Sequence, residues 1–278
     1  MAKRVLVVAN RTIGGRKLLE SVRSRASEDA GTEFHLCVPL SKPRHGNVIY
    51  DHAERDAAQL RIQLSHDVLK REGIDITGEV GDEDPFTATL DAVAVFNPDE
   101  IIVSTLPETR SGWLRRDLVD RIREETSVPV EHLVTDVESE GLAVGVTLVV
   151  ANRTSGGEQL ISTLKAQAGA DAQRVFVCVI PQEGGEGHAA HTARERLGAL
   201  LKTLRTGGVL ASGMIGDPDP YDATMNALDL FTVDKVVIST LPGEKSGWLR
   251  ADLIERVRKN TVASVEHVEV DVAEPANV

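Results

Sequence analysis

The stretch Val8-Ala9-Asn10-Arg11-Thr12-Ile13-Gly14-Gly15 returns 142 residues later as Val150-Ala151-Asn152-Arg153-Thr154-Ser155-Gly156-Gly157. A second pair of segments lies 135 residues apart, Ser111-Gly112-Trp113-Leu114-Arg115 and Ser246-Gly247-Trp248-Leu249-Arg250. A repeat of this length indicates two whole domains rather than a solenoid of short units. We therefore predict two copies of one domain, residues 1–140 and residues 141–278, the second being shorter between these landmarks.

Each copy alternates strand and helix patterns. The apolar run Val5–Ala9 is typical of a strand buried on both faces. Further strands are predicted at residues 34–38, 76–80, 100–105 and 130–134, and at residues 175–180, 210–215, 236–240 and 265–270. Asp84-Pro85 and Asp219-Pro220 have the pattern of a helix N-cap followed by proline. The order predicts an α/β fold with two Rossmann-like domains, each a five-stranded parallel sheet with helices on both faces.

The composition excludes several classes of protein. Hydrophobic residues make up 41% of the 278 residues and charged residues 27%, as in a globular protein. The net charge of −12 argues against nucleic acid as a partner, because few cations are present to displace condensed counterions. No apolar run reaches the ~20 residues that span a bilayer, and the N-terminus lacks a signal-peptide pattern. We expect a cytoplasmic protein without a membrane partner.

Further features resemble a known family. The order of elements, the turns Val80-Gly81-Asp82 and Ile215-Gly216-Asp217, and the helix-proline-strand pattern around Pro129 are similar to the universal stress protein family, over essentially the whole chain and twice. The layout resembles its tandem two-domain members. The resemblance implies an adenine nucleotide alpha hydrolase-like fold, an adenine-nucleotide cleft (ATP or AMP) in each domain, and pairing of domains through their last strands, within the chain or as a homodimer.

The chain departs from the ATP-binding members of that family at their glycine signature, Gly-x2-Gly-x9-Gly-Ser/Thr. Aligned backwards from Pro129, the four signature positions hold Val103, Leu106, Arg116 and Asp117, and in the second copy Ile238, Leu241, Ala251 and Asp252. Glycines in such loops let backbone N–H groups approach phosphates. A carboxylate in place of the last hydroxyl opposes an anion, so binding of ATP in the family's usual geometry is not expected.

Ligands of doubly wound sheets bind beyond the carboxyl ends of the strands, at the switch in strand order. This rule selects the loops after the first and fourth strands, where the copies match best. Two arginines per copy, Arg11 with Arg115 and Arg153 with Arg250, would supply positive charge. The candidate ligand-binding residues of the first copy are Ala9, Asn10, Arg11, Thr12, Gly81, Asp82, Ser104, Thr105, Ser111, Gly112 and Arg115. Those of the second copy are Ala151, Asn152, Arg153, Thr154, Gly216, Asp217, Ser239, Thr240, Ser246, Gly247 and Arg250.

Plainer interpretations stay open for these residues. Ser111 and Ser246 also suit helix N-caps, the asparagines suit side-chain turns, the aspartates suit turns or caps, and the arginines suit surface ion pairs. Trp113 and Trp248 either stack on a base or pack against the core. The strand residues His132 and His267 are either a pH switch between domains or hydrogen-bonded strand histidines, and Cys37 and Cys178 are expected to be buried.

No nucleophile elbow and no metal-ligand spacing occurs in the sequence, so no catalytic or metal-binding residue is predicted. The favoured interpretation is a non-catalytic stress-response or signalling protein that binds an adenine nucleotide or another small anion. Two alternatives are left open. One is a scaffold with degenerate clefts that acts through dimerisation and protein partners, and the other is a slow ATPase.

Overall fold

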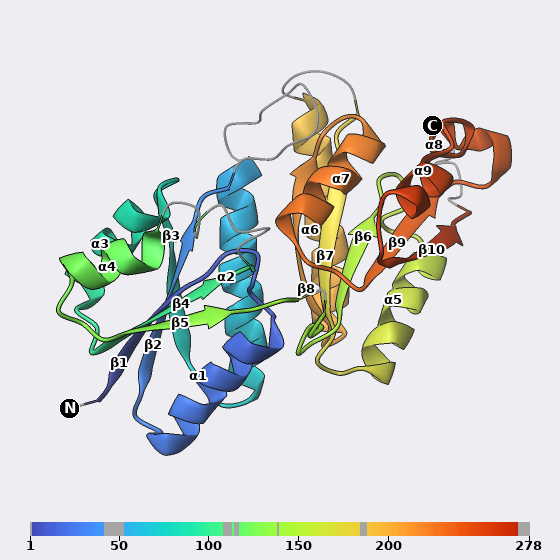
Figure 1. Ribbon diagram of the computed structural model, residues 1–278. Coiled ribbons are helices and arrows are strands. Elements are labelled where there is room, and N and C mark those ends of the chain that lie inside the picture. Colours follow the sequence, from blue (N-terminus) through green and yellow to red (C-terminus); the bar gives the residue numbers. More distant parts are fainter. Residues whose placement is uncertain are drawn as a thin grey trace. The chain divides into compact units, whose positions relative to one another are not determined.

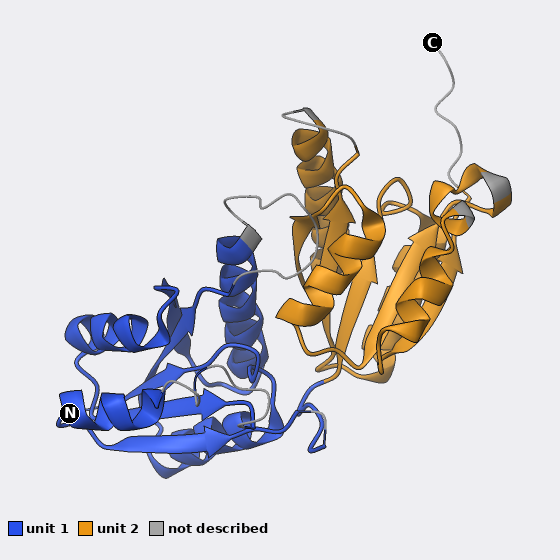
Figure 2. Ribbon diagram, turned by 45° about the horizontal axis from the view of Figure 1, so that its top comes forward, with its two compact units in different colours: residues 1–42, 54–144 blue, residues 43–53, 145–278 orange. Residues whose placement is uncertain are grey.

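The computed structural model describes residues 2–41, 53–107, 113, 117–137, 139–183 and 188–271, without the side chains of Ala53, His188, Glu244 and Arg250. The chain divides into two compact units. Unit 1 comprises Met1–Lys42 with Glu54–Val144, and unit 2 comprises Gly145–Val278 (Figure 2). The predicted boundary at residue 140 falls four residues before this division, inside a short connecting segment.

Strands and helices alternate along both units (Figure 1). Unit 1 contains β1 (Arg4–Val8), α1 (Arg16–Glu28), β2 (Glu33–Pro39), α2 (Ala53–Arg71), β3 (Ile76–Gly81), α3 (Pro85–Phe96), β4 (Glu100–Thr105), α4 (Leu118–Glu125) and β5 (Val130–Val134). Unit 2 contains β6 (Val146–Val150), α5 (Glu158–Ala170), β7 (Val175–Pro181), α6 (His188–Thr206), β8 (Leu210–Gly216), α7 (Pro220–Leu230), β9 (Lys235–Thr240), the 3₁₀ turn η2 (Gly243–Lys245), α8 (Gly247–Arg250), α9 (Leu253–Lys259) and β10 (Ser264–Glu269).

Each unit is built on one parallel five-stranded sheet. The strand orders are β3-β2-β1-β4-β5 and β8-β7-β6-β9-β10, so the chain changes direction across the sheet between β1 and β4 and between β6 and β9. The predicted α/β fold class is therefore confirmed. Helices cover both faces of the second sheet, since α5 contacts α6 while α7 contacts α9.

Apolar strands explain why helices lie on both faces. All seven residues of β7 and all five of β6 are buried, which leaves no face of either strand for water. Leu160 and Leu164 of α5 pack with Leu200 and Leu204 of α6 in one core layer against the sheet. Val, Leu and Ile thus fill the core, which accounts for an aromatic content of 3%.

The predicted caps of the third helix in each copy are confirmed. The Asp84 carboxylate accepts from the Thr87 N–H at the start of α3, and the Asp219 carboxylate accepts from the N–H groups of Tyr221 and Asp222 at the start of α7. Each cap satisfies backbone donors that have no partner in the first turn of a helix.

The predicted fourth helix is wrong in its extent. In unit 2 a single turn, α8, follows Ser246, and a second helix, α9, starts at Leu253 after Asp252 at a φ of 53°. In unit 1 the helix α4 starts at Leu118, after Asp117 at a φ of 48°. A left-handed residue ends the helical hydrogen-bond pattern, and aspartate tolerates this conformation better than most side chains. Ser111, Gly112 and Arg115 lie outside the described residues.

Cys37 and Cys178 are buried at matching places in β2 and β7, as predicted. Burial raises the pKa of both thiols to about 12. Because the thiolate is the reactive form, we expect neither cysteine of the native protein to react with a thiol reagent such as DTNB at pH 8 within minutes. Two thiols per chain should react after denaturation. Rapid labelling of the native protein would contradict the burial of these strands.

In the described part of the chain, no helix combines the length and the apolar content that a membrane crossing requires.

Candidate functional site

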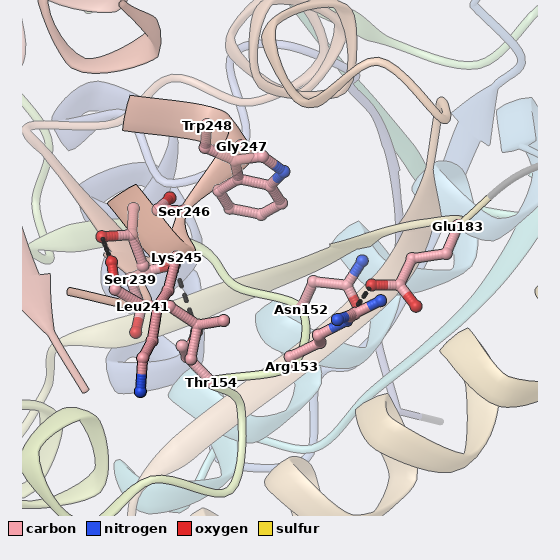
Figure 3. Close-up of a pocket in the computed structure, with 11 residues that line it drawn as sticks. Asn152, Arg153, Thr154, Glu183, Ser239, Leu241, Lys245, Ser246, Gly247 and Trp248 are labelled. Atoms are coloured by element: carbon pink, nitrogen blue, oxygen red, sulfur yellow. Dashed lines mark hydrogen bonds and ion pairs between the residues drawn. The ribbon is translucent and has the colours of Figure 1, made fainter. Parts of the chain in front are cut away.

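A pocket of about 300 Å³ lies in unit 2 where β6 and β9 end side by side (Figure 3). This is the place where the strand order reverses, and the loops after the two strands diverge there to opposite sides of the sheet. The residues that line the pocket are Asn152, Arg153, Thr154, Glu183, Ser239, Thr240, Leu241, Lys245, Ser246, Gly247 and Trp248.

Two side chains hold the loop after β6 across the strand ends. The Asn152 amide donates to the Pro181 carbonyl at 3.0 Å, and the Thr154 hydroxyl donates to the Ser239 carbonyl at 3.1 Å. Pro181 ends β7 and Ser239 belongs to β9, so the loop is tied to both neighbours of β6. The asparagine is therefore a brace between strands rather than part of a local turn.

Unit 1 repeats this bracing. The Asn10 amide donates to the Pro39 carbonyl at 2.6 Å, and the Thr12 hydroxyl donates to the Ser104 carbonyl at 3.3 Å. The four residues occupy the same places relative to β1, β2 and β4 as their counterparts do in unit 2. Both copies thus use their Asn-Arg-Thr segment to hold the loop at the switch point.

A glycine lets each loop pack closely against the segment that follows the last strand. A Cβ at Gly157 would lie 2.1 Å from Val270 Cγ1, and one at Gly15 would lie 2.3 Å from Thr135 Cγ2. The N–H of Gly157 also donates to the Thr154 carbonyl at 3.0 Å. Any side chain larger than hydrogen at this position has to displace Val270.

One side of the pocket carries a cluster of charges. The Arg153 Nε donates to Glu183 Oε1 at 2.7 Å, and Arg196 Nη1 lies 3.3 Å from Glu183 Oε2 (Figure 3). The same Arg196 nitrogen donates to Asn152 Oδ1. Partial burial works to raise the pKa of Glu183, but the hydrogen bond from Arg153 and the charges of both arginines outweigh it, so the pKa is lowered. The carboxylate is therefore ionised near neutral pH.

The other side of the pocket holds Lys245 and hydroxyl groups. Among the described residues Lys245 has neither an ion pair nor a side-chain hydrogen bond, and the buried Ser239 Oγ has no hydrogen-bond partner. The Ser246 hydroxyl accepts from the Leu249 N–H at 3.2 Å and caps α8. Ser246 thus has the plain capping role that the sequence left open, while its residue still lines the pocket.

Threonine and histidine form matching pairs in the two units. Thr240 Oγ1 lies 2.8 Å from His267 Nε2, and Thr105 Oγ1 lies 2.9 Å from His132 Nε2. Thr240 also donates its one hydroxyl proton to the Leu241 carbonyl at 2.9 Å, so the histidine is the donor in its pair. His267 therefore stabilises the end of β9 and does not act as a base toward Thr240.

Seven of the predicted residues of the second copy line this pocket: Asn152, Arg153, Thr154, Ser239, Thr240, Ser246 and Gly247. Ala151 lies fully buried at the start of the loop, and the side chain of Arg250 is outside the description. Gly216 and Asp217 lie at the end of β8, outside the lining. The Asp217 carboxylate accepts from the Asp219 N–H at 2.9 Å, which makes it a turn residue.

In the first copy, Ala9 is buried, and Ser104 and Thr105 end β4. Asp82 accepts from the Asp84 N–H at 2.8 Å, and a Cβ at Gly81 would lie 2.6 Å from that of Ala88, so this glycine permits the packing of α3. Next to Asn10, Arg11 lies near the buried Arg61 of α2. Burial, and then the charge of Arg11, lower the pKa of Arg61 to about 9.

Several residues at the pocket were missed by the sequence-based prediction. Lys245 precedes Ser246-Gly247 as Arg110 precedes Ser111-Gly112, so a repeated basic residue was available as a signal. Trp248 was considered for stacking but not placed in the site. Glu183 and Arg196 gave no signal, because the residue that matches Glu183 in the first copy is Ser41.

The chemistry of the pocket is that of binding. It offers cations, hydroxyl groups, a carboxylate and an indole ring. Among the residues that the structure describes, no cluster of three or more His, Cys, Asp or Glu side chains could hold a metal ion.

Comparisons with known proteins agree with the predicted resemblance. A universal stress protein from Archaeoglobus fulgidus DSM 4304 is 14% identical, with 96% of each chain covered and a TM-score of 0.36. A protein of the same description from Pseudomonas aeruginosa UCBPP-PA14 is 17% identical, with 97% of this chain and 94% of that chain covered and a TM-score of 0.32. The cytoplasmic domain of a prokaryotic cation chloride cotransporter is 12% identical, with 97% and 96% covered and a TM-score of 0.32.

No protein-family model and no curated sequence matches the chain. Universal stress proteins thus stand among the similar structures, as the motifs predicted. Because each TM-score is below 0.5, the fold assignment rests on the strand orders of the two sheets.

Proposed function

We propose that this protein is a non-catalytic binding protein whose unit 2 holds a small phosphate-bearing ligand, an adenine mononucleotide, in the pocket between β6 and β9. The observation that supports this proposal best is the lining of that pocket. It combines the indole of Trp248 with the cation of Lys245 and the hydroxyl groups of Ser239 and Thr240.

The lining suits the two ends of a nucleotide. An indole ring offers a stacking surface for a base, which is worth about 1–3 kcal/mol in other nucleic-acid ligands. Lys245 offers a point charge to a phosphate, without an ion pair among the described residues. The buried Ser239 Oγ would gain a hydrogen-bond partner from a bound ligand.

The size of the pocket favours a mononucleotide over a triphosphate. Its volume of about 300 Å³ stands at the lower end of the range for ligand pockets, about 300–1,000 Å³. The signature positions of the ATP-binding members hold Leu241 and Asp252, and Asp252 adopts the left-handed conformation at the start of α9. A carboxylate there works against a polyphosphate.

The wider proposal includes the biological setting. We propose that the two units are copies of one domain, that the protein serves stress adaptation or signalling in the cytoplasm, and that the last strands pair domains, within the chain or in a homodimer. Both last strands, β5 and β10, are edge strands of their sheets, which leaves backbone groups available for pairing. Light scattering on the purified chain tests the homodimer.

Isothermal titration of the full-length protein with adenosine, AMP, ADP, ATP and cyclic AMP tests the ligand. We expect AMP to bind, Trp248→Ala to weaken both AMP and adenosine about tenfold or more, and Lys245→Ala to weaken AMP alone about tenfold. Lys259→Ala in the exposed last turn of α9 removes the same charge outside the pocket and serves as the control. No heat and no thermal shift with any of these compounds would leave the scaffold as the better interpretation.

A further inference from the structure

The two copies differ at one charged position beside their Asn-Arg-Thr loops. In unit 2 the chain continues Pro181-Gln182-Glu183 after β7, and in unit 1 it continues Pro39-Leu40-Ser41 after β2. The structure confirms that the two positions correspond, because each lies beside the asparagine of its loop. The Asn10 amide donates to Ser41 Oγ at 2.6 Å, whereas Glu183 shares Arg196 with Asn152.

Glu183 is held at the pocket by two arginines that come from different elements. Arg153 belongs to the loop after β6 and Arg196 belongs to α6, and each contacts a different oxygen of the carboxylate. Two contacts fix the orientation of the carboxylate in the pocket lining, where its side chain stays 39% exposed.

The positive charge on this side of the pocket is therefore already matched from within the protein. A phosphate group that approached Arg153 would have to displace Glu183 or lie next to it. Like charges a few ångströms apart repel by several kcal/mol at most in partly buried surroundings, and less where water screens them. The penalty grows with each negative charge that a ligand carries.

We infer that Glu183 is an internal counter-anion that sets the charge selectivity of the pocket in unit 2, so that the pocket accepts ligands of low negative charge, adenosine and AMP, and disfavours ADP and ATP. This inference rests on the proposed function, because it concerns the same pocket. It assigns Glu183 as a specificity-determining residue, and it explains why this copy carries a carboxylate where the first copy carries a hydroxyl.

A purely structural role for Glu183 would have a different signature. If the carboxylate only braced Arg153 and Arg196, its loss would loosen the loop and weaken every ligand alike. A counter-anion instead affects ligands in proportion to their charge, and it leaves uncharged adenosine unaffected. The dependence of affinity on ligand charge thus separates the two roles.

The test is isothermal titration of adenosine, AMP, ADP and ATP into the wild-type protein, Glu183→Gln and Glu183→Ser. Glu183→Gln keeps the shape of the side chain and removes its charge, and Glu183→Ser copies the first unit. Glu255→Gln is the matched control, because Glu255 is an exposed residue of α9 in the same unit and does not line the pocket.

We expect both Glu183 variants to leave adenosine unchanged and to tighten the other ligands by about three- to tenfold for each added negative charge, so that ATP gains most. The control should bind as the wild type does. Equal affinities in wild type and variants for AMP and ATP would overturn the inference and leave the proposed function standing. Binding by the variants alone would support the inference and contradict the proposed function of the native protein. If no ligand binds to any of the proteins, both are wrong.

Discussion

Phe176→Ala is expected to lower the free energy of unfolding of unit 2 by about 3–5 kcal/mol. Phe176 stands in β7, is completely buried, and packs in the layer formed with Leu160, Leu164 and Leu200. Removing the ring takes away its contacts and leaves a cavity that rigid strands on both sides cannot fill. Whole domains are stable by about 5–15 kcal/mol, so the loss is a large part of the total.

Urea unfolding followed by tryptophan fluorescence measures this effect. Trp248 reports on unit 2 when Trp113 of unit 1 is replaced by phenylalanine in the same background. Phe176→Leu serves as the control, because it keeps most of the volume and should lower the free energy of unfolding by less than about 1.5 kcal/mol. Similar midpoints for the alanine variant and the parent would show that β7 does not lie in the core.

Gly157→Ala is expected to lower the free energy of unfolding of unit 2 by about 1–3 kcal/mol and to weaken ligand binding in the pocket. The new Cβ would stand 2.1 Å from Val270 Cγ1 and 3.1 Å from the Thr154 carbonyl oxygen. Val270 is fully buried, and its N–H donates to the Thr240 carbonyl at 2.9 Å. Displacing Val270 therefore also moves the end of β9, where Thr240 lines the pocket.

The preceding glycine provides the comparison for this experiment. A Cβ at Gly156 would meet no atom within 4 Å, so Gly156→Ala should change the free energy of unfolding by less than about 1 kcal/mol. Thermal unfolding and titration of both variants measure the two effects. Equal stability of the two variants would contradict the close packing of the loop against Val270.

Much of the fold could be predicted because the patterns behind it are local. Apolar runs such as Val5–Ala9 predict buried strands, and Asp84-Pro85 and Asp219-Pro220 predict helix starts that the structure confirms. The break at Asp252 could not be predicted in this way. Aspartate is ordinary within helices, and the left-handed turn before the buried Leu253 and Ile254 follows from how α9 packs on its sheet.

The pocket was predictable in part for a related reason. Parallel strands that are neighbours end at the same edge, so the Asn152 loop and Ser239 had to meet once the strand order was inferred. Lys245 and Trp248 accompany the repeated Ser-Gly segment and could have been included. The pairing of Glu183 with Arg196 has no counterpart in the first copy, and no spacing in the sequence indicates it.

The sequence by itself determined that this protein has two doubly wound parallel sheets, with the Asn-Arg-Thr loops at their switch points. Periodicity, caps and the repeat with offsets of 142 and 135 residues carry that information along the chain. Only the tertiary structure decided the charge balance of the pocket. Whether Arg153 and Arg196 face a ligand or a carboxylate depends on distances between side chains far apart in the chain, and packing alone sets those distances.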